Sequence, residues 1–315
     1  MQTFPLTSDD RDLMTLVKTP CEEKLSTAFL LDQDVNATSM KHYFKGLRQY
    51  FTWLSDNEIN LRNVDRSTII RYKHDLISRG LSALSVAAYL SVVRCFYTWA
   101  EAHKHYPNVA AGVKSPRTER KFKKRPLSAK QASDLLEYFE GNPRDYAIVS
   151  LCLRTGLRTI EVTRANISDI EIIDGKKVLH IQGKGKVDKF DYVVLTDKCY
   201  LSIAEYLGTR ESNLTNEPLF VSQANRNYNE RLTTHSIRVL VKKGLRAIGL
   251  DNHSYTAHSL RHSCATMIIE SGGSIVDAQK VLRHSSSVTT EMYTEMINEK
   301  QRFENPPELL LDDKF

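Results

Sequence analysis

The chain has 315 residues, of which 41% are hydrophobic and 26% are charged, and its formal net charge is +6. This length and apolar content exclude a disordered chain and predict two globular domains that each bury a core. The first residues lack the basic and apolar pattern of a signal peptide, and we expect no later apolar run to be long enough to cross a bilayer. The composition therefore predicts a cytoplasmic protein.

The positive charge is concentrated in one part of the chain. Residues 36–125 contain 17 Lys/Arg and 6 Asp/Glu, a local charge of +11, so the rest of the chain is acidic. Such local basicity favours an anionic polymer as partner, without distinguishing DNA from RNA.

Four helices are predicted before residue 104. A short helix spans about 22–31, the next carries an apolar stripe between Tyr43 and Leu54, and two more span 67–79 and 85–103. On the second helix Lys41, Lys45 and Arg48 share the face opposite the apolar stripe, where DNA contact and a solvated face are equally compatible with the pattern.

Residues 114–126 read as an exposed linker, because they contain Ser-Pro and Arg-Pro pairs and a run of Arg and Lys without apolar periodicity. A basic linker of this kind suits wrapping around an anionic rod, although a solvated charge run fits equally well. The basic side chains in question include Lys121, Lys123, Lys124 and Arg125.

After the linker, Ser128 caps a predicted helix that ends at Gly141, and an apolar helix over 144–155 leads into Gly156-Leu157-Arg158. The period then changes to that of strands over 171–175, 177–182 and 190–195, joined by Asp-Gly and by a Gly-Lys-Gly-Lys turn. Helices are expected to resume near Asp197 and to continue to the end. The predicted fold class is mainly α with a small antiparallel β-sheet (α+β).

Three motifs carry most of the functional information. Residues 155–161 read Thr-Gly-Leu-Arg-Thr-Ile-Glu, residues 258–266 read His-Ser-Leu-Arg-His-Ser-Cys-Ala-Thr, and residues 282–293 run from Leu-Arg-His to Met-Tyr. In this order, around a three-stranded sheet, they resemble the boxes of the tyrosine recombinase family, also called phage integrases. Residues 38–104 resemble the helical, SAM-like core-binding domain of the Xer-type members of that family.

The resemblance implies a site-specific DNA recombinase that cuts and rejoins strands through a 3′-phosphotyrosyl intermediate. A phosphate under attack gathers negative charge, which the planar guanidinium group matches with paired donors. The implied roles are a phosphate clamp for Arg158 and Arg261, a general acid for Lys184, an acid/base for His258, a phosphate donor for His284 and the nucleophile for Tyr293.

Further residues have supporting roles in this interpretation. Glu161 lies one helical turn after Arg158 and would orient it, and His262 is expected to make a structural hydrogen bond. The spacing of His258, His262 and Cys264 is also typical of metal ligands, but neither a metal nor a cofactor is expected, and ATP is not needed. Lys186 competes with Lys184 for the role of general acid. Candidate DNA contacts are Lys41, Lys45, Arg48, Arg94, Lys121, Lys123, Lys124, Arg125 and Lys186.

The five cysteines are odd in number and form no Cys-x-x-Cys pair, which argues against a disulfide framework and against a cysteine zinc site. Most of them are expected to be small core residues. They are Cys21, Cys95, Cys152, Cys199 and Cys264.

The expected domain organisation follows from the motifs and the linker. It comprises an extension over 1–20, a core-binding domain over 21–113, the basic linker over 114–126, a catalytic domain over 127–302 and a tail over 303–315 that docks on a neighbouring protomer. The expected partners are duplex DNA with a specific site, three further copies of the chain in a tetramer on DNA, and an accessory directionality or architectural protein. This places the protein at the nucleoid.

The sequence departs from the family pattern in two places. Arg283 stands where the family usually has glycine, and it either contacts a phosphate or points to solvent. The first 35 residues are too short and too acidic for a separate arm-site DNA-binding domain, since they contain seven Asp/Glu and three Lys/Arg.

Three functions other than recombination are also compatible with parts of the sequence. A type IB topoisomerase would use similar chemistry to relax supercoils as a monomer. A DNA-binding regulator would have the same fold without using the active site, which the complete set of six catalytic residue types disfavours. An RNA-binding protein would be expected to show an aromatic-rich platform motif, which the sequence lacks.

Overall fold

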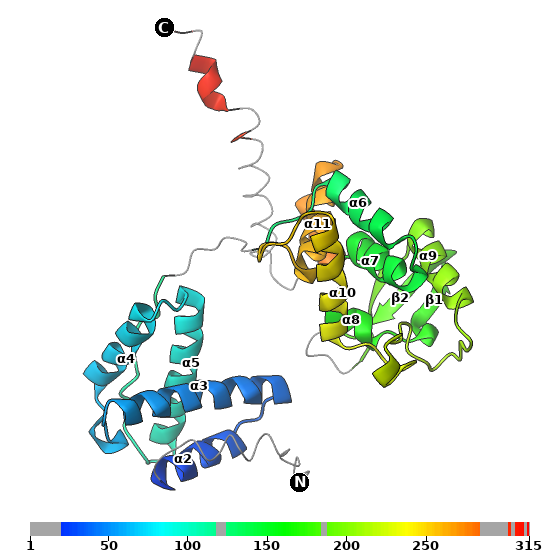
Figure 1. Cartoon of the computed structure of the whole chain (residues 1–315). Helices are drawn as coiled ribbons and strands as arrows, with labels where there is room; N and C mark the ends of the chain where they lie inside the picture. The colour runs from blue at the N-terminus through cyan, green and yellow to red at the C-terminus, as the bar shows by residue number, and fades with distance from the viewer. Residues whose placement is uncertain are drawn as a thin grey trace. The chain divides into compact units, whose positions relative to one another are not determined.

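The computed structural model of the chain describes residues 20–117, 124–183, 188–283, 302–303, 306–311 and 314 (Figure 1). Contacts within the chain divide it into two compact units, Met1–Glu119 and Arg120–Phe315, which we describe separately. The described part is mostly helical and contains one three-stranded antiparallel sheet. The predicted α+β fold class is therefore confirmed.

The described part of the first unit, residues 20–117, contains four α-helices, as the apolar pattern predicted. The starts of α3, α4 and α5 are fixed by Asn36, Asp65 and Ser82, whose side-chain oxygens each accept a backbone N–H three residues later. Since Asp65 and Ser82 cap their helices, α4 and α5 begin slightly earlier than the apolar pattern indicates. The bounds are α2 Pro20–Leu31, α3 Ala37–Asp56, α4 Arg66–Ser78 and α5 Ala83–Ala102, with a 3-10 turn η1 at Leu61–Asn63.

Aromatic side chains hold this unit together. The rings of Phe51 and Phe96 meet edge to face at 5.5 Å, and the hydroxyls of Tyr50 and Tyr97 lie 2.8 Å apart in the buried core. Helices α3 and α5 approach so closely at Gly46 that a Cβ there would lie within 2.8 Å of the Val92 side chain. This packing leaves one face of α3 free for the charged residues that the sequence places there.

Contrary to the expectation from the sequence, one described helix, α5, is long and apolar enough to cross a membrane by length and composition alone. The two ends of its buried face, Val86 and Ala100, both lie in the core of the first unit. The apolar character of α5 is therefore used for packing within this unit.

The second unit is built around helix α7. Figure 1 shows α7 in the middle of this unit, where it packs against α6, α9, α10 and α11. The predicted cap of α6 is confirmed, because Ser128 and Gln131 form a reciprocal capping box. The bounds of the first helices are α6 Ala129–Phe139, α7 Pro143–Thr155 and α8 Thr159–Arg164, followed by a 3-10 turn η2 at Ile167–Asp169.

The sheet has the strand order β1-β2-β3, with both pairs antiparallel. Leu179 of β2 pairs with Ile170 of β1 and Val193 of β3, and this face of the sheet contributes to the core. Asp174 and Gly175, both with positive φ, make the tight turn between β1 and β2. The strands are β1 Ile170–Ile173, β2 Lys176–Ile181 and β3 Asp191–Val194.

The expectation that helices continue without interruption after Asp197 is wrong. Between α9 and α10, residues 209–233 contain only the 3-10 turn η3 and two isolated bridges, Asn166 with Pro218 and Val221 with Arg231. Phe220 in this stretch is buried, so the irregular segment supplies core residues without forming a helix. The later elements are α9 Asp197–Gly208, η3 Asn225–Asn227, α10 Thr234–Ala247, α11 Ala257–Glu270, α12 Ile275–Leu282 and η4 Pro307–Leu311.

Candidate active site

The turn between α7 and α8 places Arg158. Helix α7 ends at Gly156, whose backbone is left-handed with φ 61° and ψ 23°. A Cβ at Gly156 would lie 2.4 Å from Cδ2 of Leu282, so the position requires glycine for space as well as for conformation. The end of α12 therefore packs directly on the turn that presents Arg158, the N-cap residue of α8.

Glu161 makes two hydrogen bonds to Arg158. One Glu161 oxygen accepts the backbone N–H of Arg158 at 2.7 Å, and the other accepts Nη1 of its guanidinium group at 2.9 Å. The Glu161 side chain is 1% exposed, whereas that of Arg158 is 31% exposed. A buried carboxylate thus fixes one edge of a guanidinium group whose remainder reaches the surface.

Arg261 lies in α11 and is almost fully buried, with 2% exposure. Its Nη1 donates to the carbonyl of Gly156 and its Nη2 to the carbonyl of Leu282. These two carbonyls end α7 and α12, so one guanidinium group joins the first and third sequence motifs through the second.

His258 lies one turn before Arg261 on the same helix. Although its side chain reaches the surface, surrounding protein lowers its pKa by desolvation, and the positive charges of Arg261, Arg158 and Lys124 lower it further. Arg158 and Arg261 therefore both lie close enough to the imidazole of His258 to lower its pKa. His258 is therefore neutral near pH 7 and able to accept a proton.

Lys124 also contributes to the electrostatics of His258, a role that the sequence did not predict for it. Its Nζ donates to the carbonyl of His253, and the next residue, Arg125, donates its backbone N–H to the carbonyl of Ser254 at 2.9 Å. The end of the basic segment is thereby fixed beside the start of α11, where its charge acts on His258.

Lys124→Met is expected to raise the pKa of His258, because removing a nearby positive charge favours the protonated imidazole. NMR titration of the histidine ring protons at low salt measures this pKa. Lys130→Met removes an exposed lysine from α6 and serves as the control, with no change expected. The electrostatic coupling is absent if both variants titrate like the unmodified protein.

His262 is buried and its ring meets that of His258 edge to face, with centroids 4.6 Å apart. Among the residues that the structure describes, no group of three or more His, Cys, Asp or Glu side chains is placed to hold a metal ion. The neighbouring Cys264 is buried as expected for a core cysteine, and burial raises the pKa of its thiol to about 11. Cys152 and Cys199 are likewise buried, with pKa values raised to about 12 by desolvation.

Four of the predicted site residues lie outside the described part of the chain. They are Lys184, Lys186, His284 and Tyr293. The structure describes the residues that flank them, since Gly183 accepts a hydrogen bond from Arg164 and the chain is described up to Arg283. Lys121 and Lys123 of the linker also lie outside the described residues.

Comparison with known protein families decides the class of the molecule. Residues 125–300 match the phage integrase family, and residues 27–104 match the N-terminal SAM-like domain of phage integrases. The chain belongs to the phage integrase family. The resemblance seen in the three motifs is confirmed, and with it the prediction of a Xer-like tyrosine recombinase, an enzyme of site-specific DNA recombination.

Several relatives of this phage integrase match over most of their length. The tyrosine recombinase XerD of Staphylococcus haemolyticus is 29% identical over 277 residues, covering 84% of the chain and 90% of that protein. The tyrosine recombinase XerC of Haemophilus ducreyi is 30% identical over 224 residues, covering 69% of the chain and 70% of that protein.

Solved structures of the family share its fold. A crystal structure of the XerH site-specific recombinase bound to palindromic difH substrate aligns with a TM-score of 0.72 and 20% identity, covering 93% of the chain and 92% of that one. A lambda integrase tetramer bound to a Holliday junction aligns with a TM-score of 0.69 and 18% identity, covering 93% of the chain and 81% of that one.

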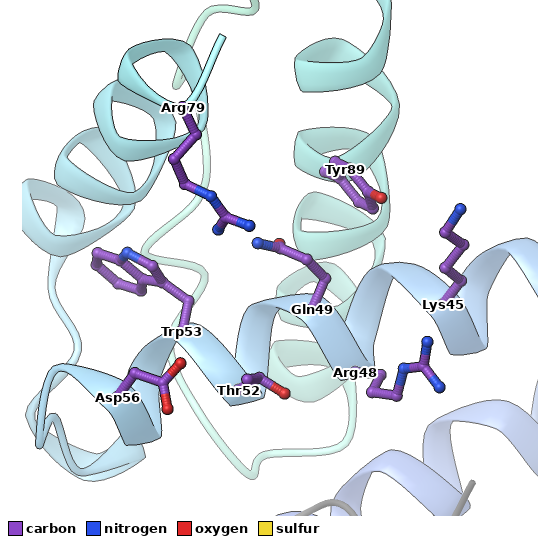
Figure 2. A pocket seen from close by; sticks show the side chains of 8 residues that line it. All are labelled: Lys45, Arg48, Gln49, Thr52, Trp53, Asp56, Arg79 and Tyr89. Carbon is purple, nitrogen blue, oxygen red and sulfur yellow. The ribbon is translucent and has the colours of Figure 1, made fainter. Parts of the chain in front are cut away.

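The SAM-like unit of this integrase contains a polar pocket on the charged face of α3 (Figure 2). Figure 2 shows Arg79 and Gln49 pointing into it, with Tyr89 of α5 on another wall. At its floor lies Trp53, whose Nε1 is buried and finds no acceptor among the described residues. The pocket has a volume of 220 Å³ and is lined by Lys45, Arg48, Gln49, Thr52, Trp53, Asp56, Arg79 and Tyr89.

Two of the other predicted DNA contacts in this unit have different surroundings. Lys41 is exposed one turn before Lys45 on α3. Arg94 donates to the carbonyl of Val113 at 3.2 Å and to the hydroxyl of Ser115 at 2.9 Å. Arg94 therefore holds the chain that follows α5 in place, so its guanidinium group already makes contacts within the protein.

Proposed function

We propose that this chain cuts and rejoins duplex DNA at a specific site through a phosphotyrosyl bond formed by Tyr293. The observation that carries the proposal is that two fixed guanidinium groups, Arg158 held by Glu161 and Arg261 joined to the carbonyls of Gly156 and Leu282, both act on the pKa of His258. Such a group of residues binds a phosphodiester and accepts a proton from an attacking hydroxyl.

In the proposed first step, the Tyr293 hydroxyl attacks the phosphorus atom and gives its proton to His258. The bond from phosphorus to the 5′ oxygen breaks, and that oxygen takes a proton from Lys184 or, as the competing candidate, Lys186. The product is a 3′-phosphotyrosyl link and a free 5′-hydroxyl. In the reverse direction a 5′-hydroxyl from a partner strand attacks the link and releases Tyr293 with its proton.

The two arginines would stabilise the charge that gathers on the non-bridging oxygens during each step, with His284 as a further donor. Removing one such donor in other enzymes costs about 3–4 kcal/mol of transition-state stabilisation. Because one ester bond replaces another, the phosphotyrosyl link conserves the free energy of the broken bond. We therefore propose that the reaction needs neither ATP nor a bound metal.

We propose that a core-binding domain over 21–113 binds DNA and that a catalytic domain over 127–302 cuts and rejoins it. Residues 114–126 would form a basic linker between the two domains. The acting species would be a tetramer on two DNA sites, by analogy with the lambda integrase tetramer bound to a Holliday junction. The tail over 303–315 would dock on a neighbouring copy, since Leu309 and Leu310 in its 3-10 turn are exposed. An accessory protein would set the direction of the reaction.

The pocket of the SAM-like unit is proposed to receive a DNA phosphate. Lys45, Arg48 and Arg79 bring three positive charges to it, against the single negative charge of Asp56. Phosphate contacts of this kind position the protein without reading bases.

Replacing both Lys45 and Arg48 with glutamine is expected to weaken DNA binding and to make it less dependent on salt, by about one unit of slope for each lost phosphate contact. Fluorescence anisotropy over a range of salt concentrations gives both quantities. The control replaces Arg62 and Lys104, two exposed cations outside the pocket, with glutamine. If both double variants lose the same DNA affinity, the pocket has no specific part in binding and only the net charge of the unit affects DNA affinity.

The experiment that tests the proposed chemistry uses the full chain and a nicked suicide DNA that carries its natural site. Covalent adducts are trapped, digested with protease, and mapped by mass spectrometry. The expected result is a nucleotide on the peptide containing Tyr293, linked through a 3′-phosphate. Adducts on another residue, or none with a site that the protein binds, would overturn the proposal.

Two alternatives give different results with the same protein. A type IB topoisomerase would relax a supercoiled plasmid as a monomer without joining two sites. A DNA-binding regulator would bind the site without forming an adduct. We also propose that the protein works in the cytoplasm at the nucleoid, where its DNA lies.

A further inference from the structure

Arg283 is the residue at which this chain departs from the family pattern, and it does not point to solvent. It follows α12 with a left-handed backbone, φ 53° and ψ 48°, which favours the glycine that the family usually has there. Its side chain is only 13% exposed. An arginine at this position therefore bears a backbone cost that its side-chain contacts must offset.

Those contacts join it to the residue that orients Arg158. Nη2 of Arg283 lies 2.9 Å from an oxygen of Glu161, and its Nη1 donates to the carbonyl of Val281 at 2.7 Å. The Glu161 carboxylate thus bridges two guanidinium groups, that of Arg158 at one oxygen and that of Arg283 at the other. Glu161 is buried, so this bridge is shielded from solvent.

The bridge reinforces a second connection between the same two segments. Arg261 donates to the carbonyl of Gly156, two residues before Arg158, and to that of Leu282, directly before Arg283. Burial lowers the pKa of Arg283, while Glu161 and Asp191 oppose that shift, so the guanidinium group keeps its charge. The chain that leaves α12 is therefore tied at Leu282 and at Arg283 to the turn that presents Arg158.

From this geometry we propose that Arg283 is a positioning residue. Through Glu161 it sets the place of Arg158 relative to the start of the segment that carries His284 and Tyr293. It also shares the negative charge of Glu161, which leaves more of the positive charge of Arg158 available to a phosphate. The inference rests on the proposed cleavage chemistry and concerns a residue that the family pattern does not supply.

The test compares single-turnover adduct formation at saturating suicide DNA with the affinity for the same DNA. Arg283→Met is expected to slow adduct formation about ten- to hundredfold, as a misplaced reacting group does, with a much smaller change in affinity. Arg283→Lys keeps the charge and is expected to recover most of the rate. The matched control is Arg246→Met, which removes an exposed arginine paired with Asp251 and is expected to change neither quantity.

A double-mutant cycle with Glu161→Gln separates positioning from folding. If the two residues act through one contact, the double variant is expected to be no slower than the slower single variant, because coupled residues are not additive. The proposal is overturned if Arg283→Met forms adducts at the unmodified rate, if Arg283→Lys recovers nothing, or if the two losses add. A different result would contradict the proposed cleavage chemistry, namely that the unmodified protein forms no adduct on Tyr293.

Discussion

Tyr293→Phe is expected to abolish covalent adduct formation on suicide DNA while leaving DNA binding unchanged. The substitution removes one oxygen atom and keeps the ring, so packing and net charge are preserved. A phenol has a pKa of about 10 and attacks a phosphate only when its proton is accepted by a neighbour. Without the hydroxyl, neither His258 nor the arginine clamp has a nucleophile to activate.

The measurement is a denaturing gel of DNA and protein trapped together, with binding followed separately by gel shift. Tyr228→Phe is the matched control, because Tyr228 is an exposed tyrosine of the same unit and its hydroxyl has no proposed role. The control is expected to form adducts at the unmodified rate. Trapping by the Tyr293 variant would remove Tyr293 from the role of nucleophile.

The helices of the first unit were predictable because their signals are local. The apolar stripe of α3 and the capping residues Asp65 and Ser82 lie within one or two turns of the structure that they specify. The irregular segment over 209–233 was not predicted, since its contacts include a bridge from Pro218 to Asn166, which is distant in sequence. Helical periodicity carries no information about such contacts.

The same contrast holds for the active site. The resemblance of the three motifs to the tyrosine recombinase family pointed to Arg158, Arg261 and His258, and in the structure the charges of both arginines lower the pKa of that histidine. The surroundings of Arg283 were not predictable, because its contact with Glu161 joins residues 122 positions apart. In the sequence, Arg283 is unusual only because it stands where the family usually has glycine.

Lys124 shows why a charge run is hard to interpret from sequence alone. Its contact with His253 spans 129 positions, so no local pattern distinguishes it from the other basic residues around it. In the structure it is a fixed charge that acts on His258, whereas the sequence suggested only a candidate DNA contact. Both uses are compatible, because a lysine beside a phosphate site attracts the backbone and tunes the histidine.

Arg261→Lys is expected to lower the rate of DNA cleavage about a thousandfold, the upper range for loss of one donor to a developing anion. The guanidinium group donates through Nη1 and Nη2 to two separate carbonyls. An ammonium group is a single point of charge and does not reproduce this geometry. Single-turnover adduct formation at saturating DNA measures the loss.

Folding must be measured alongside, because Arg261 is buried and Arg158 is not. Each buried carbonyl that loses its donor costs about 1–3 kcal/mol, so Arg261→Lys should also lower the free energy of unfolding. Arg158→Lys, at a side chain that is 31% exposed, is expected to lose a similar factor in rate with a smaller loss of stability. Denaturant unfolding separates the two effects.

The comparison of these two variants tests the arrangement of the clamp. If both arginines bind the phosphate, the two lysine variants are expected to lose similar factors in cleavage rate. Their free energies of unfolding should differ, because of the two arginines only Arg261 also joins the ends of α7 and α12. A rate within about threefold of the unmodified protein for Arg261→Lys would exclude it from the clamp, because even a weak donor is worth more than that. In that case its buried guanidinium group would serve the fold alone.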